Sequence, residues 1–228
     1  WYGALAIYTK DQELGTDKIL GWKLPNTSIL NYRLVSSFLF TTVNGEEVLY
    51  IGGQIGSTRL LKFDGKEMYP VLKSEIPSAV TALAPGENGN IWIATQGKGL
   101  MSYAPDGTLT TFNTSNSNIP ANPVYDIKTD HRGGYWLACQ RSLVKFDGKD
   151  FIAYQTDLIE PMENMNFMTY VLPEEDGTVW VGTKKQGLFK FANGEFTPVD
   201  IAPASLLADN YMAFSMWFGL PRRMVAGF

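Results

Sequence analysis

The sequence contains one cysteine, Cys139, and one histidine, His131. A single cysteine excludes an internal disulfide framework, and no apolar run approaches the ~18 residues that a membrane-spanning helix needs. The formal net charge of −4 provides no basic footprint for nucleic acid. Aromatic residues are abundant instead, at 13%, together with 22 glycines and 12 prolines. This combination favours short strands separated by turns over a helical bundle.

One motif recurs along the chain. In its clearest copies, a strand with tryptophan in second place is followed by a strand that begins Gly-Leu or Ser-Leu and ends in an aromatic residue. The aromatic anchors of the copies are Trp1, Tyr50, Trp92, Trp136, Trp180 and Trp217. Their separations are 49, 42, 44, 44 and 37 residues, so the repeat has a period near 44. This period fits a four-stranded blade and excludes a solenoid, whose coils take about 20–30 residues.

Two glycine-containing turns divide each repeat. Gly89, Gly133 and Gly177 each lie three residues before a tryptophan, within polar segments. The second set of turns consists of Asp64-Gly65, Asp106-Gly107, Asp147-Gly148 and Asn193-Gly194, and Asn44-Gly45 marks the first turn of a weaker copy. Asp-Gly and Asn-Gly pairs readily take positive φ values, so we expect type I′ hairpins.

These turns divide each repeat into four short strands. The predicted inner strands are 79–84, 124–129 and 168–172, and the predicted outer strands are 108–112, 151–154 and 196–199. A lone sheet of this kind cannot bury two apolar faces, whereas sheets stacked around an axis can. We therefore predict an all-β fold: a β-propeller of four-stranded antiparallel blades, with about five to six blades over residues 1–228, as one domain or propeller segment. Because five blades leave surplus strands and six are two strands short, we expect a larger propeller.

The order of polar turn, glycine, tryptophan, Gly/Ala-Thr step and Gly-Leu resembles the two-component regulator propeller repeat. The linker over 112–124 is also similar to the blade linker of that family. The resemblance covers roughly residues 78–199 and, in eroded form, 36–77. It implies a periplasmic or extracellular sensor region of a hybrid two-component system, a class in which polysaccharide fragments are common signals. Related blades also occur in envelope proteins that lack a kinase, and this sequence shows no kinase or receiver motif.

Ligands of propellers generally bind at one face, where the loops after the second strands gather with the blade linkers. In this sequence those loops vary in composition while the strands beside them repeat. The predicted ligand-binding residues in them form a polar, net basic group: Gln96, Lys98, Gln140, Arg141, Lys184, Lys185 and Gln186. Arginine and lysine bind carboxylate or sulfate groups, so a neutral or acidic glycan fits, although a merely solvated rim is the alternative. The insertion at 154–167 departs most from the repeat and is expected to overhang this face.

Asp126 is the remaining candidate for ligand binding, because it lies on an inner strand where Ala82 and Tyr170 occupy the aligned positions. It either faces the central channel and holds a ligand, or caps a neighbouring backbone group. The anchor tryptophans have a simpler interpretation. Their recurrence at one strand position indicates packing between blades rather than stacking on sugars.

No catalytic constellation is found. His131 lies in a variable turn position without the partners that a metal site or a Ser–His–Asp triad requires. Cys139 replaces a threonine on a core strand and is expected to be buried and inert. The carboxylates considered for an acid/base pair all fall in turns or linkers, namely Glu160, Glu163, Glu174, Glu175 and Asp176. The sequence therefore predicts no catalytic residue, no metal and no cofactor.

Three functions follow, in order of preference. The first is the ligand-sensing propeller of a two-component system, which binds an oligosaccharide or another small ligand without catalysis. The second is an envelope-associated interaction propeller, whose partner is an envelope protein or a second copy of the chain. The third is a propeller lyase or hydrolase. Neither nucleic acid nor a membrane span enters any of them.

Overall fold

The computed structural model describes residues 34–55, 58–65, 67–72, 75–159 and 167–200, together with four short strands outside these ranges. Those strands are β1 (Thr9–Lys10), β2 (Asp17–Lys18), β19 (Ser215–Gly219) and β20 (Arg223–Gly227). Within the described residues the regular structure is β-strand, apart from a single turn of 3₁₀-helix, η2 (Glu87–Gly89). None of it is a helix long and apolar enough to cross a membrane.

Four antiparallel sheets of four consecutive strands, which we call blades A to D, form the body of the fold. Blade A consists of β3 (Leu34–Val43), β4 (Glu46–Ile55), β5 (Thr58–Phe63) and β6 (Met68–Leu72). Blade B consists of β7 (Val80–Pro85), β8 (Ile91–Thr95), β9 (Leu100–Tyr103) and β10 (Leu109–Phe112). Blade C consists of β11 (Asp126–Thr129), β12 (Tyr135–Cys139), β13 (Ser142–Phe146) and β14 (Phe151–Tyr154). Blade D consists of β15 (Met168–Pro173), β16 (Val179–Thr183), β17 (Leu188–Ala192) and β18 (Glu195–Val199).

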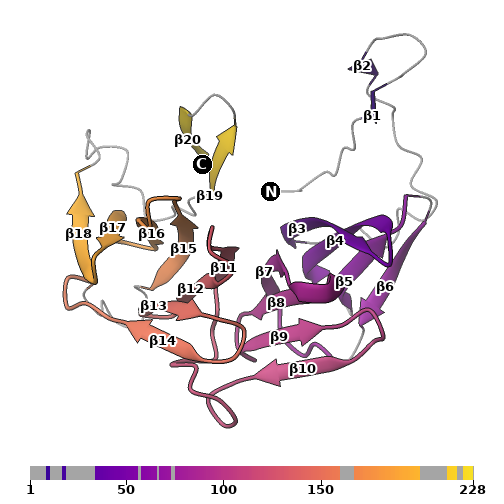
Figure 1. Cartoon of the computed structure of the whole chain (residues 1–228), viewed down its shortest axis with the longest axis horizontal. Coiled ribbons are helices and arrows are strands. Elements are labelled where there is room, and N and C mark those ends of the chain that lie inside the picture. Colours follow the sequence, from indigo (N-terminus) through magenta and orange to yellow (C-terminus); the bar gives the residue numbers. More distant parts are fainter. Residues whose placement is uncertain are drawn as a thin grey trace.

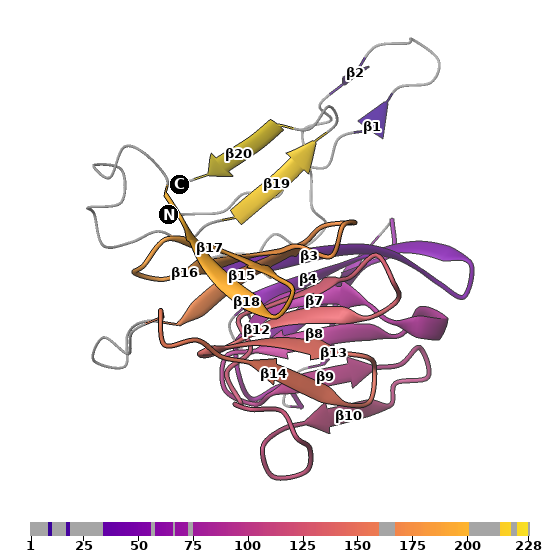
Figure 2. The same cartoon turned by 60° about the vertical axis from the view of Figure 1, so that its left-hand side comes forward.

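The blades follow one another around an arc, with the first strand of each blade innermost (Figure 1). Neighbouring inner strands are in contact, β3 with β7, β7 with β11, and β11 with β15. Figure 2 shows the same sheets stacked on one another. Buried side chains from adjacent blades form separate clusters between A and B, between B and C, and between C and D. The arrangement is that of propeller blades and confirms the predicted all-β class.

The predicted number of blades, five to six, is wrong for the described residues, which contain four complete sheets. Trp217 lies in β19, which pairs only with β20, and Trp1 falls outside the described residues. The prediction failed because it counted aromatic anchors. An anchor marks one strand, whereas a blade needs three further strands and a neighbouring sheet to cover its apolar face.

The strand boundaries of the three clearest repeats agree with the sequence. Inner strands β7, β11 and β15 start within two residues of their predicted positions, and outer strands β10, β14 and β18 within one. Three of the four inner strands begin with a register shift, a feature that the sequence did not indicate. At these bulges the Ser36 hydroxyl donates to the Val80 carbonyl, and the Thr81 hydroxyl to the Val124 carbonyl, each at 2.6 Å. The bulges of blades A and B therefore each link an inner strand to the next blade.

The hairpin turns are of two kinds. At Asn44-Gly45, φ is 53° and 85°, and Asn193-Gly194 has nearly the same pair of values, so the type I′ prediction is confirmed for the Asn-Gly pairs. It is wrong for the Asp-Gly pairs, where the glycine alone has positive φ. The aspartate instead accepts a backbone hydrogen bond at its side chain, as Asp106 does from the Thr108 N–H at 2.8 Å. Because the aspartate carboxylate accepts a hydrogen bond from a backbone N–H two residues later, the turn closes without a positive φ at the aspartate.

These turn carboxylates predict stability that is sensitive to acid. Backbone N–H donors hold the pKa values of Asp106, Asp147 and Asp176 below their ordinary value. Because the pKa is lower in the folded state, the unfolded chain takes up protons first, and the stabilisation present above the unfolded value of ~3.9 is lost as pH falls through the folded values. We expect the melting temperature to fall between about pH 5 and about pH 3. Replacing all three by asparagine should flatten this slope in circular dichroism melts, and an unchanged slope would contradict the assignment.

The anchor tryptophans differ in how they pack. Trp92 and Trp136 are 8% and 7% exposed, and each contacts the following blade. The Trp92 ring lies 4.9 Å from Phe146, and the Trp136 ring lies 5.7 Å from Phe191. The predicted role in packing between blades is confirmed for both. Trp180, on the last complete blade, is only partly buried.

Candidate functional site

The loops between the second and third strands lie at the same end of each blade as the linkers between blades, because alternate connections of a meander share an end. In blade B, Thr95 organises this loop: its hydroxyl donates to the Gly99 carbonyl at 2.8 Å and accepts from the Lys98 N–H at 3.0 Å. Thr183 forms the same pair of hydrogen bonds in blade D. A buried threonine at the end of the strand therefore gives both loops one shape.

The corresponding loop of blade C is one residue shorter. Cys139 replaces the threonine, and only Gln140 and Arg141 separate it from its strand partner Ser142. Gln140 has φ of 52°, a conformation that is costly for a residue other than glycine. Its carbonyl accepts a hydrogen bond of 2.7 Å from the Met168 N–H at the start of the next blade. The strained turn is thus held in place by blade D.

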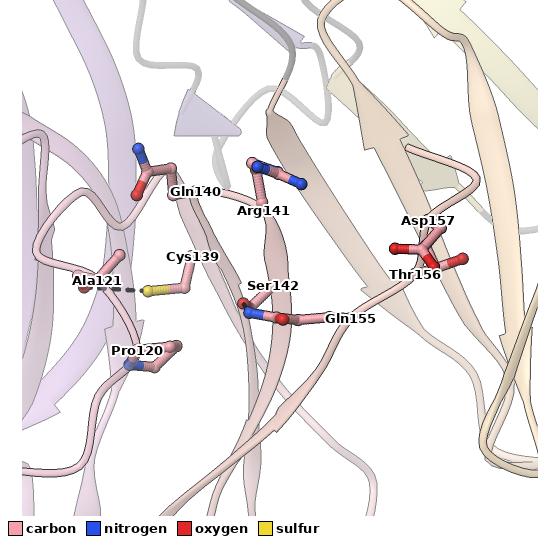
Figure 3. Close-up of a pocket in the computed structure, with 9 residues that line it drawn as sticks. All are labelled: Pro120, Ala121, Cys139, Gln140, Arg141, Ser142, Gln155, Thr156 and Asp157. Atoms are coloured by element: carbon pink, nitrogen blue, oxygen red, sulfur yellow. Dashed lines mark hydrogen bonds between the residues drawn. The ribbon is translucent and has the colours of Figure 1, made fainter. Parts of the chain in front are cut away.

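A cavity of about 270 Å³ lies at this shortened loop (Figure 3). Its walls come from the loop and from the two linkers that enter and leave blade C. The lining residues are Pro120, Ala121, Cys139, Gln140, Arg141, Ser142, Gln155, Thr156 and Asp157. Drug-sized ligands occupy pockets of about 300–1,000 Å³, so this cavity suits a small ligand. We call it the blade C cavity.

The lining of the blade C cavity is polar. Arg141 and Asp157 are exposed, lie on two different segments of the lining in Figure 3, and form no ion pair among the described residues. The Gln155 side chain donates to the Ser142 hydroxyl at 3.0 Å. The Cys139 thiol donates to a linker carbonyl at 3.1 Å, and burial raises the pKa of this thiol to about 12. The Arg141 guanidinium is therefore the charged donor available to a ligand, and the cysteine is not a nucleophile.

Of the eight predicted site residues, the structure brings two together, Gln140 and Arg141. Gln96, Lys98 and Lys185 are exposed on the loops of blades B and D, outside the lining of the blade C cavity.

Two further predicted residues on the blade D loop have contacts within the protein. The Lys184 ammonium lies 5.0 Å above the Phe167 ring, which itself stacks on Tyr125 with ring centroids 4.2 Å apart. The Gln186 side chain donates to the Leu158 carbonyl at 3.3 Å. These contacts hold the blade D loop against the linker from blade C.

Sequence reasoning missed part of the lining. Gln155, Thr156 and Asp157 belong to the insertion that was expected to overhang this face, and its residues 160–166 lie outside the described part of the chain. Pro120 and Ala121 were predicted only as part of the linker between blades. The length difference between loops was visible in the sequence, but which linkers line the resulting hollow was not.

Asp126 caps backbone groups, one of the two roles expected for it. It is 3% exposed, and its Oδ2 accepts a 3.1 Å hydrogen bond from the Val171 N–H on the inner strand of blade D. Its Oδ1 accepts from the Ile127 N–H at 2.9 Å and from the Lys128 ammonium at 2.6 Å. Burial raises the pKa of Asp126, and Lys128 and the two backbone donors oppose that rise. The carboxylate caps backbone groups across two blades.

The remaining titratable groups are not assembled into a site. His131 is exposed in the turn between β11 and β12, and Glu174, Glu175 and Asp176 are exposed in the turn of blade D. Glu160 and Glu163 lie outside the described residues. Across the described ranges, no three His, Cys, Asp or Glu side chains are grouped so that they could hold a metal ion.

Residues 74–97, which include β7 and β8, match the family model of the two component regulator propeller. The resemblance seen in the sequence is thereby confirmed for blade B, which carries a repeat of this type. None of the curated proteins matches the chain.

Solved structures show the same fold. The extracellular domain of a proposed hybrid two component system from B. thetaiotaomicron has a TM-score of 0.64 and 19% identity, over 87% of this chain and 28% of that one. Virginiamycin B lyase from Staphylococcus aureus has a TM-score of 0.60 and 12% identity, over 89% and 65% of the two chains. PorZ, a surface component of the type-IX secretion system of Porphyromonas gingivalis, has a TM-score of 0.59 and 15% identity, over 90% and 32%. At such identities the likeness establishes the propeller fold alone, and this chain spans less than two thirds of each structure.

Proposed function

We propose that this chain is a ligand-binding propeller of an extracytoplasmic sensor, which recognises a saccharide in the blade C cavity and performs no chemistry on it. The observation that carries the proposal is the shortened loop of blade C. There a positive φ at Gln140 and the unpaired guanidinium of Arg141 border a polar cavity. Backbone strain of this kind costs stability and concentrates at functional sites.

The groups around the cavity select the class of ligand. A guanidinium binds carboxylate or sulfate through two parallel hydrogen bonds. The Asp157 carboxylate and the Thr156 hydroxyl accept hydrogen bonds from sugar hydroxyls on the other wall. An acidic sugar residue with neighbouring hydroxyls therefore satisfies both walls. A longer oligosaccharide extends toward the remaining rim residues, Gln96, Lys98, Lys184, Lys185 and Gln186.

The similar structures support a proposal on the setting of the propeller. The similar domain from B. thetaiotaomicron is extracellular, and the repeat in blade B is that of a two component regulator propeller. A periplasmic or extracellular location for this chain is therefore part of the proposal. So is its place as one propeller segment, residues 1–228, of a larger ring, because the four described blades form an arc and the similar sensor domain is much longer.

Arg141→Gln should weaken the binding of an acidic oligosaccharide by about 10- to 100-fold, because a charge-assisted hydrogen bond is worth about 1.5–3 kcal/mol. Isothermal titration calorimetry with uronate-containing, sulfated and neutral oligosaccharides measures this loss. The matched control is Arg132→Gln, which removes the same charge from an exposed turn at the other end of blade C. The control should bind as the wild type does.

Three results would count against the proposal. No binding of any saccharide to the wild type, or an equal loss in both arginine variants, would remove the blade C cavity as the site. Release of new reducing ends or unsaturated products from any oligosaccharide would favour the lyase or hydrolase alternative.

A protein-interaction role has its own supporting observation. Phe38 and Phe40 lie on one face of the inner strand β3 and are 51% and 66% exposed. Exposed aromatic side chains of this size are typical of protein contact surfaces. Dimerisation, or binding of an envelope protein, that is lost when both are changed to serine, together with no saccharide binding, would favour this function.

A further inference from the structure

A second cavity lies between blades B and C, at the end opposite the blade C cavity, and has a volume of about 400 Å³. Its walls are the turns at this end of the two blades and the side chains of β8, β9 and β10 that face blade C. The lining residues are Glu87, Asn88, Asn90, Trp92, Ser102, Thr110, Phe112, Gly133, Tyr135, Asp147 and Gly148. We call it the B–C cavity.

Trp92 lines the B–C cavity with a donor that has no acceptor. The side chain is 8% exposed and packs edge-on against Phe146 and Tyr135, with ring centroids 4.9 and 5.7 Å away. Its Nε1 is the one buried side-chain nitrogen or oxygen without a hydrogen-bond partner among the described residues. An unsatisfied buried donor costs about 1–3 kcal/mol. A ligand that supplies an acceptor for the Trp92 N–H would therefore recover this cost.

The equivalent tryptophan of blade D has the hydrogen-bond acceptor that Trp92 lacks. Trp180 Nε1 donates to Glu174 Oε1 at 3.0 Å, and Glu174 lies six residues before it. The residue six positions before Trp92 is Gly86. Glu174 and Gly86 hold the same place in their turns, because each N–H donates to the carbonyl four residues later at 2.8 Å. Blade B therefore closes its turn with the same backbone hydrogen bond as blade D, but it has no acceptor side chain at this position.

The backbone does not require glycine at this position. Gly86 has φ of −109°, which any residue adopts. A Cβ there would lie 3.1 Å from both the Cβ and the backbone oxygen of Asn90, so a side chain requires the turn backbone to shift by a few tenths of an ångström. The consequence of Gly86 that the structure shows is a buried indole N–H without an acceptor at the wall of the B–C cavity.

The chemistry of the lining indicates a neutral, hydroxyl-rich ligand. Ser102 and Thr110 offer hydroxyls, and Asn88 and Asn90 offer carboxamides. The charged groups of the lining are the carboxylates of Glu87 and Asp147, with no lysine or arginine among the lining residues. An anion is therefore repelled, whereas sugar hydroxyls both donate to the carboxylates and accept from the indole N–H.

We propose that the B–C cavity is a binding site for one neutral pyranose residue, in which a ligand oxygen accepts the hydrogen bond of Trp92 Nε1. This site is separate from the blade C cavity and does not depend on it. Since Nε1 is buried in the free protein, the side chains that cover it turn aside as the ligand enters. The aromatic wall gives apolar contact to the sugar ring while the turns bind its hydroxyls.

The test uses the whole chain labelled with ¹⁵N-tryptophan, whose six indole N–H signals are followed by NMR during titration with methyl glucoside, methyl galactoside, methyl mannoside and glucuronate. At least one neutral glycoside should move the Trp92 signal and leave that of Trp180 in place. Glucuronate should bind about fivefold more weakly, because its carboxylate meets Glu87 and Asp147. No movement of the Trp92 signal with any of the three glycosides, or tighter binding of glucuronate, would overturn the proposal.

Two sets of variants separate binding from folding. Gly86→Glu supplies the acceptor found in blade D, so it should satisfy Trp92 internally and weaken glycoside binding about tenfold. Thr110→Val should also weaken binding, whereas Thr111→Val, on the opposite face of the same strand and outside the lining, should not. Equal effects of Thr110→Val and Thr111→Val would contradict the site even if Gly86→Glu failed to fold. Arg141→Gln should leave this binding unchanged.

Discussion

Trp136→Ala should lower the free energy of unfolding by about 3–5 kcal/mol, the usual cost of deleting a buried tryptophan side chain. The indole is 7% exposed and lies between blades C and D, 5.7 Å from Phe191 and 5.8 Å from Tyr154. Lys145 also places its ammonium 5.3 Å from the ring centre. The substitution therefore removes contacts of the indole within blade C and contacts with blade D. Guanidinium denaturation followed by circular dichroism measures it.

Trp180→Ala is the matched comparison and should cost less, about 1–2 kcal/mol, because its indole is partly exposed in the native state. From the repeat alone, both tryptophans were expected to pack between blades, since they occupy the same strand position. The structure separates them because blade D has no described four-stranded sheet beyond it. An equal loss in both variants would show that another part of the chain covers Trp180. Full stability of Trp136→Ala with loss of saccharide binding would instead place Trp136 in a ligand site.

Much of the fold could be predicted because its determinants are local and repeat. The glycine three residues before each tryptophan and the Asn-Gly or Asp-Gly pair after each aromatic end position the turns, and the strands between them follow within one or two residues. Besides the number of blades, the type of turn at the Asp-Gly pairs was predicted wrongly. There the side-chain carboxylate competes with the backbone conformation, as it does at Asp106, and φ preferences alone do not include that competition.

The candidate sites were less predictable for a related reason. The repeat alignment identified the variable loops, so Gln140 and Arg141 were found, but a cavity is formed by whatever segments surround a loop. Residues 120–121 and 155–157 reach the blade C cavity from linkers that no repeat constrains. The sequence also contains a signal for the B–C cavity. Comparison of Gly86 with Glu174 and Asp130 across the repeats shows which blade lacks a side chain beside its tryptophan.

Asp126→Ala should lower the free energy of unfolding by about 2–4 kcal/mol, although an alanine occupies the aligned position of blade B. The variant leaves the buried N–H groups of Ile127 and Val171 without their acceptor. The Lys128 ammonium loses its partner as well, but its side chain is 35% exposed and turns to water, which limits the cost. Urea or guanidinium denaturation at neutral pH measures the difference.

Asp126→Ser is the informative control, because blade A has a serine that caps the next inner strand from the same position. Ser37 occupies the position aligned with Asp126, and its hydroxyl accepts a 3.0 Å hydrogen bond from the Leu83 N–H of the next inner strand. A serine at 126 can therefore accept from Val171 in the same way, and should recover part of the stability that alanine loses. If serine and alanine cost the same, the carboxylate does not act by capping the next blade. If neither costs anything and saccharide binding is lost, Asp126 serves a ligand instead, the first of the two roles that the sequence left open.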